Sequence, residues 1–122
     1  DRIMDSISAH LSQKMSSDDI DRGIAFMEKH YGQDITRGQV AEEAGMSESH
    51  FARLLKDKTG LSFTDYLNQM RLDRAAELLR KTDKGLMHIA LDTGFSDQSY
   101  FTRVFRKHMK LTPGQYRAKF RN

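Results

Sequence analysis

The sequence predicts an all-α fold of about seven helices, in which two helix-turn-helix subdomains are joined by a long linker helix. Apolar residues recur at helical spacing along most of the 122-residue chain. No segment alternates convincingly with the period of two that is typical of a β-strand. The middle of the chain also repeats, because the segment from Val40 to Ser47 aligns with the segment from Ile89 to Ser96, 49 residues later.

The repeat continues after one extra residue, so that its offset becomes 50 residues. Two copies are too few for a solenoid, which needs about three repeats or more. Each copy instead predicts a helix, a glycine-containing turn and a second helix, and the second helix of such a motif can enter the major groove of DNA. Residues of identical type meet in five pairs: Phe51 with Phe101, Arg53 with Arg103, Leu61 with Leu111, Tyr66 with Tyr116, and Arg71 with Arg121.

Residues 1–17 are predicted to form a linker or arm from an upstream region. Ile3, Ile7, Leu11 and Met15 recur every four residues, which places them on one narrow apolar stripe of a helix. Such a stripe suits a linker helix or a dimerisation strip, and a frayed arm is the alternative. Because the chain starts at Asp1 and not at methionine, we expect it to be part of a longer polypeptide.

The first helix-turn-helix subdomain is predicted over residues 18–61. Serines and aspartates at positions 16–19 favour the start of a helix, and Gly32 is expected to end it. The other signals in this subdomain are a capping box of Thr36 with Gln39, a turn at Gly45, a helix cap at Ser47 and a stop at Gly60.

The linker helix is predicted over residues 62–82, which at 1.5 Å per residue gives a length of about 30 Å. Two recognition helices on one side of a DNA duplex lie about 34 Å apart, so this helix has a suitable length for a spacer. The second subdomain is predicted over residues 83–122. Its signals are a stop at Gly94, a cap at Ser96 or Asp97, and a capping box of Thr112 with Gln115 around Pro113.

Composition excludes several classes of protein. Hydrophobic residues make up 38% of the chain and charged residues 30%, which is typical of a globular protein. No apolar run approaches the ~18 residues that span a bilayer, and no signal peptide is visible. The absence of cysteine excludes disulfides, thiolate zinc sites and cysteine catalysis. We therefore expect a cytoplasmic protein with no membrane partner.

Basic residues are concentrated towards the C-terminus. Between Ser96 and Asn122 there are seven Arg or Lys residues against one acidic residue, Asp97. Residues 1–19 carry two bases and four acids. This asymmetry favours a polyanionic partner for the C-terminal half, although a solvated basic face gives the same pattern.

The second helix of each subdomain is predicted to be amphipathic. In the first, Phe51, Leu54 and Leu55 lie opposite a continuous polar face. Arginine can bond two acceptors of guanine, glutamine suits adenine, and the threonine methyl can contact thymine. A solvated amphipathic helix is the alternative. The outward-facing residues are Ser49, Ala52, Arg53 and Lys56 in the first helix, and Gln98, Ser99, Thr102, Arg103 and Arg106 in the second.

These motifs resemble the DNA-binding domain of AraC/XylS-family bacterial transcription regulators. The resemblance covers about Ile20 to Phe120 and is most specific from Ile89 to Arg106, followed by Leu111-Thr112-Pro113. It implies sequence-specific binding to double-stranded promoter DNA, with two recognition helices in consecutive major-groove segments. It also implies activation through RNA polymerase and, in many members, an upstream sensor or effector domain.

The resemblance and the helix faces together predict two sets of DNA contacts. Base contacts are expected from Ser49, Ala52, Arg53, Gln98, Ser99, Thr102 and Arg103. Phosphate contacts are expected from Ser47, His50, Lys56, Asn68, Arg71, Ser96 and Arg106. We expect no catalytic residue, cofactor or metal site, because the five histidines are scattered without a close ligand pair and no nucleophile–base–oxyanion set is visible.

Two departures from the family pattern affect these expectations. Ser49 and Ala52 are small, so the first subdomain is expected to contact fewer bases. Lys110 stands where Gly60 stands in the first subdomain, so the second recognition helix is expected to end differently. An alternative function is a protein-interaction module whose basic face meets an acidic partner, such as the polymerase or a sensor domain. An enzyme is a third hypothesis, and no motif supports it.

Overall fold

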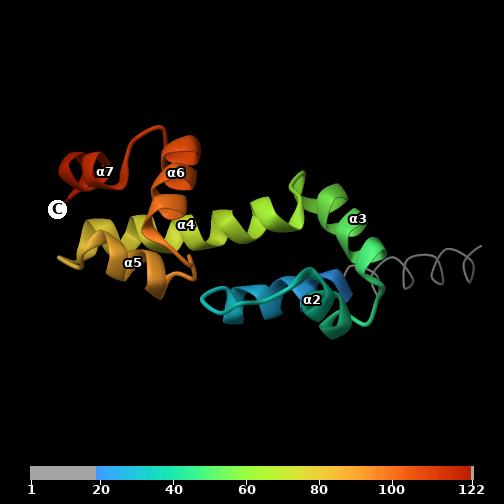
Figure 1. The fold of residues 1–122 in the computed structure, drawn as a ribbon. Helices are drawn as coiled ribbons and strands as arrows, with labels where there is room; N and C mark the ends of the chain where they lie inside the picture. Colours follow the sequence, from blue (N-terminus) through green and yellow to red (C-terminus); the bar gives the residue numbers. More distant parts are fainter. Residues whose placement is uncertain (1–18, 122) are drawn as a thin grey trace, which may run out of the picture. The chain divides into compact units, whose positions relative to one another are not determined.

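The computed structural model of the chain describes residues 19–121, and the predicted arm at residues 1–17 lies outside this part. The first helix of the described part covers residues 19–30. Residues 19–121 contain helices and no strand, which confirms the all-α prediction. The following helices are α2 (Arg37–Glu43), α3 (Glu48–Thr59), α4 (Phe63–Lys81), α5 (Leu86–Asp92), α6 (Gln98–Met109) and α7 (Pro113–Phe120) (Figure 1).

Contacts divide the described chain into two compact units. Unit 1 comprises residues 19–29 and 35–63, and unit 2 comprises residues 30–34 and 64–121. This division differs from the predicted one, in which residues 62–82 form a separate linker. From Thr64 onward α4 belongs to unit 2, because its residues Leu72, Ala75 and Leu79 are fully buried in the core of that unit.

Local capping sets the helix boundaries in unit 1. The Thr36 hydroxyl accepts a hydrogen bond from the Gln39 N–H at 3.1 Å, and the Thr36 N–H donates to Gln39 Oε1 at 2.9 Å. These two bonds confirm the predicted capping box at the start of α2. The Ser47 hydroxyl accepts from the His50 N–H at 3.2 Å and begins α3. Gly45 joins the two helices with a φ of 72°, which is the left-handed region that favours glycine.

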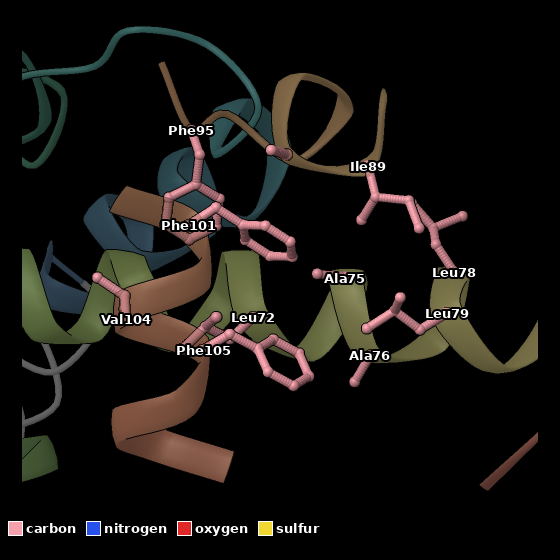
Figure 2. Packing of buried hydrophobic residues seen from close by; sticks show 11 residues of the cluster. Leu72, Ala75, Ala76, Leu78, Leu79, Ile89, Phe95, Phe101, Val104 and Phe105 are labelled. Atoms are coloured by element: carbon pink, nitrogen blue, oxygen red, sulfur yellow. The ribbon is translucent and has the colours of Figure 1, made fainter. Parts of the chain in front are cut away.

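The core of unit 2 joins α4, α5 and α6 around a group of aromatic rings. Figure 2 shows Phe101 and Phe105 of α6 pointing towards the side of α4 that carries Leu72 and Ala75. The ring centroids of Phe101 and Phe105 are 5.7 Å apart, and Phe95 lies 5.2 Å from Phe101. Because these phenylalanines are buried, α6 is held firmly by one face.

Two arginines donate to backbone carbonyls in or just after the last turns of helices in unit 2. Arg71 donates to the carbonyl oxygens of Tyr31 at 2.7 Å and Gln33 at 3.0 Å. Arg117 donates from Nη2 to the carbonyl oxygens of Thr82 and Lys84, and from Nε to that of Leu79. The last carbonyls of a helix and those of the following turn receive no bond from the helix itself, so the two guanidiniums supply donors to them.

The end of α6 corrects a prediction. Lys110 was expected to end this helix differently from Gly60, yet both residues adopt the left-handed conformation, with φ of 66° and 78°. Each donates its N–H to the carbonyl four residues earlier, at 2.9 Å for Lys110 and 2.7 Å for Gly60. The requirement to satisfy that carbonyl decides the geometry, and a lysine adopts it despite the steric cost to its Cβ.

Among residues 19–121, no helix is both long enough and apolar enough to cross a membrane.

Candidate nucleic-acid interface

The outer face of α3 carries the predicted contacts of unit 1. Phe51 and Leu55 are fully buried on the opposite side of this helix. The outer face holds Ser49, Arg53 and Lys56, which are exposed, and Ala52, which is half-buried. Within the described chain, neither Arg53 nor Lys56 takes part in a salt bridge, so both cations are available to an external anion.

The α6 helix repeats this arrangement in unit 2. Phe101 and Phe105 are fully buried and Val104 is nearly so. Asp97 caps the helix, because its carboxylate accepts from the Tyr100 N–H at 2.7 Å, and this resolves the choice between Ser96 and Asp97. The outward-facing residues are exposed except for Thr102, which is half-buried: Gln98, Ser99, Thr102, Arg103 and Arg106.

A surface groove of about 840 Å³ runs along this outer face of α6. All four base contacts predicted for the second helix line it. Within residues 19–121 the lining contains four cations, Arg103 among them, and no acidic residue, so the groove suits a polyanion. Its lining residues are Gln98, Ser99, Thr102, Arg103, Arg106, Lys107, Lys110 and Thr112.

Three of these lining residues were not predicted as contacts. Lys107 follows Arg103 by four residues, and Lys110 follows Arg106 by four, so helical spacing could have found both. Thr112 lies beyond the end of α6 and serves as the cap of α7, with its hydroxyl accepting from the Gln115 N–H at 3.1 Å. Its position in the groove depends on how the chain turns after Lys110, which periodicity does not describe.

Arg103 is positioned by a short chain of contacts inside unit 2. Its guanidinium carbon lies 5.6 Å from the centroid of the Tyr100 ring, within the range of a cation–π interaction. The Tyr100 hydroxyl in turn accepts a hydrogen bond from Asn68 Nδ2 at 3.1 Å. Because Asn68 belongs to α4, a second helix fixes the ring on which the Arg103 guanidinium packs.

Asn68 and Arg71 occupy positions that differ from those of the other predicted phosphate contacts. Asn68 is only 6% exposed and bonds to Tyr100. The Arg71 guanidinium bonds two carbonyls, and burial lowers its pKa from the ordinary value, with Asp34 acting in the opposite direction. For these two residues the structure favours a role within the fold. The remaining five phosphate candidates are exposed: Ser47, His50, Lys56, Ser96 and Arg106.

Comparison with known proteins gives consistent results. A family model described as a helix-turn-helix domain matches residues 40–119. An uncharacterized HTH-type transcriptional regulator of Staphylococcus aureus is 33% identical over 110 residues, which cover 89% of this chain but only 15% of that protein. The chain therefore spans about 15% of the length of this curated relative.

Two solved structures share the fold closely. The C-terminal domain of AraT, a response regulator from Geobacillus stearothermophilus, is 34% identical with a TM-score of 0.81, covering 85% of this chain and 87% of that one. The DNA-binding domain of the global transcriptional factor AdpA, solved in complex with a target DNA, is 25% identical with a TM-score of 0.79. That match covers 83% of this chain and 91% of the AdpA chain.

Proposed function

This chain belongs to the AraC-type helix-turn-helix family, and we propose that it is the sequence-specific double-stranded DNA-binding domain of a bacterial transcription regulator. The observation that carries this proposal is the α6 groove, where predicted base contacts lie together with cations that form no salt bridge within residues 19–121. A polar face of this kind on an anchored helix has the chemistry that base edges and phosphates require.

The proposed roles divide by chemistry. Arg103 offers two donors to guanine O6 and N7, Gln98 offers a donor and an acceptor to adenine, and the Thr102 methyl contacts thymine. Ser99 and, in unit 1, Ser49, Ala52 and Arg53 complete the base contacts. The exposed side chains of Ser47, His50, Lys56, Ser96 and Arg106 bind phosphates, which fix the position of the protein on the duplex.

The proposed binding mode places the two recognition helices in consecutive segments of the major groove. Segments on one side of B-DNA repeat about every 34 Å. Where the spacing of the helices differs from this repeat, the duplex bends at an elastic cost of order 1–6 kcal/mol. A single copy of the chain then occupies two adjacent sites without dimerising.

The partners of the whole regulator form part of the same proposal. Promoter DNA lies in the bacterial cytoplasm, and RNA polymerase is the partner through which a bound regulator would activate transcription. An upstream sensor or effector domain in the same polypeptide would supply the signal. The family is one of DNA-binding regulators, and the proposed action is binding without a chemical step.

Selection of duplexes from a random library tests the proposal. The enriched duplex and a scrambled control are titrated with the 122-residue chain across a range of salt concentrations. We expect a motif in two blocks about one helical turn apart, bound at least ~10³-fold more tightly than the control. Weak, steeply salt-dependent and sequence-independent binding would contradict specific recognition. Failure to bind any duplex would favour the alternative, in which the basic face meets an acidic protein.

A further inference from the structure

Lys110 is the one residue other than glycine with a positive φ in the described part of the chain. Its φ of 66° brings the Cβ of an L-residue too close to the backbone, a conformation that glycine adopts without this cost. The equivalent position at the end of α3 carries Gly60. The left-handed C-cap is therefore occupied by glycine, the favoured residue, at the end of α3 and by lysine, a disfavoured residue, at the end of α6.

Lys110 also lies in the groove on α6. Its side chain lines the groove together with Arg103, Arg106 and Lys107, and it is exposed. Within residues 19–121 it forms no salt bridge. Four cations that share one groove without a lining acid repel one another in the free protein, and a row of phosphates relieves this repulsion.

We propose that Lys110 binds a backbone phosphate of DNA, and that its charge is present at this position at the expense of folding stability. This inference rests on the proposed function, since the anion is the DNA to which α6 binds. Strained backbone positions are found where a side chain is required for function, and here the required feature is the ammonium group. Lysine acts as a flexible point charge, which suits a phosphate better than the planar edge of a base.

A favourable interaction with the C-terminal end of the α6 dipole is a competing explanation for a cation at this position. Arg106, Lys107 and His108 already lie in the last turn of α6, so the helix end is supplied with positive charge without Lys110. Glycine relieves the backbone under either explanation, so the two explanations differ in what they predict for DNA binding. If Lys110 only served the helix end, its replacement by glycine would leave DNA binding unchanged.

The experiment compares Lys110→Gly, Lys110→Asn and Lys110→Arg in the 122-residue chain. Lys110→Gly removes the charge and relieves the backbone, so we expect the Tm to rise by about 4 °C or more. Removing one phosphate contact should weaken binding about 8-fold near 0.1 M salt and reduce the slope of log K against log salt by about 0.9. The loss should be equal on the selected and the scrambled duplex, because a phosphate carries no sequence information.

Lys110→Asn and Lys110→Arg separate the effect of the side-chain charge from the effect of the backbone conformation. Asparagine tolerates the left-handed conformation but is neutral, so Lys110→Asn should lose as much affinity as Lys110→Gly. Lys110→Arg keeps the charge and should bind like the parent. Gly60→Lys is the converse control. A Cβ at Gly60 meets nothing within 4 Å, so the substitution disfavours only the backbone conformation, and the Tm should fall.

Unchanged affinity and salt slope in Lys110→Gly, with the parent binding normally, would overturn the inference while leaving the proposed function intact. A parent chain that binds neither duplex would instead refute the proposed function, and the role of Lys110 with it.

Discussion

Gly94 offers a stringent test of how unit 2 is assembled. Its φ is 101°, and a Cβ placed on it would lie 2.5 Å from the Tyr31 carbonyl oxygen and 2.7 Å from Arg71 Nε. These two atoms are donor and acceptor of one hydrogen bond, 2.7 Å long. The missing side chain of Gly94 therefore leaves the space in which Arg71 reaches the backbone.

The cost of Gly94→Ala follows from these contacts. A positive φ costs an L-residue about 1–2 kcal/mol. The methyl group also displaces a hydrogen bond made by a charged donor, which is worth about 1.5–3 kcal/mol. We expect a total loss of about 2.5–5 kcal/mol, a large fraction of the roughly 5–15 kcal/mol by which a domain is stable.

Urea unfolding followed by far-UV circular dichroism measures this loss as a shift of the midpoint at constant m-value. Gly114→Ala is the matched control in the same unit, because Gly114 is an exposed residue of α7 and an added Cβ meets nothing within 4 Å. That change should stabilise the helix by about 0.5–1 kcal/mol. Gly45→Ala should fall between the two, at about 1–2 kcal/mol, because its nearest atom is the movable Arg22 Nη2 at 3.3 Å. A loss below about 1 kcal/mol for Gly94→Ala would refute the reasoning.

Three further predictions concern single charges. Arg117→Met should destabilise unit 2 by about 3–5 kcal/mol in urea unfolding, because three carbonyls lose their donor. The control Arg121→Met removes only a surface ion pair and should cost at most about 1 kcal/mol. Equal losses in the two variants would contradict the structural role of Arg117. Lys84 donates to the Asp92 carboxylate at 2.9 Å, and this hydrogen bond lowers the pKa of that group from its ordinary value. The contribution of this ion pair to folding stability is therefore present above about pH 4 and is lost as the pH falls through the lowered pKa of Asp92. Lys84→Ala should raise the Asp92 pKa in an NMR titration. Arg53→Ala should cost about 1–3 kcal/mol of binding to the selected duplex and relax the preference at one position, and an equal loss on random DNA would exclude base contact.

Local chemistry explains why much of the fold could be predicted. A capping box needs only two residues three positions apart, so Thr36 with Gln39 and Thr112 with Gln115 could be identified from the sequence. The polar faces of α3 and α6 follow from helical periodicity for the same reason. The prediction for Lys110 failed because local rules favour glycine at a left-handed helix end, whereas a lysine adopts the same conformation here and donates its N–H to the Arg106 carbonyl.

Tertiary contacts explain what the sequence did not predict. Asn68 and Arg71 were expected to contact phosphates, on the basis of the resemblance and the helix faces. Their side chains bond to Tyr100, Tyr31 and Gln33 in sequence-distant parts of unit 2, and local sequence rules do not predict these bonds. The full extent of the α6 groove likewise depends on the turn after the helix.

The separation of the two faces of α6 has a consequence for how such a domain diverges. Phe101 and Phe105 hold the helix through side chains that are fully buried, whereas Gln98 and Ser99 are exposed. Substitutions at exposed positions away from caps and buried contacts usually change stability by no more than about 0.5 kcal/mol. The base contacts proposed for Gln98 and Ser99 can therefore change one mutation at a time, without passing through an unstable intermediate. Arg103 is less free to change, because its guanidinium stacks on Tyr100.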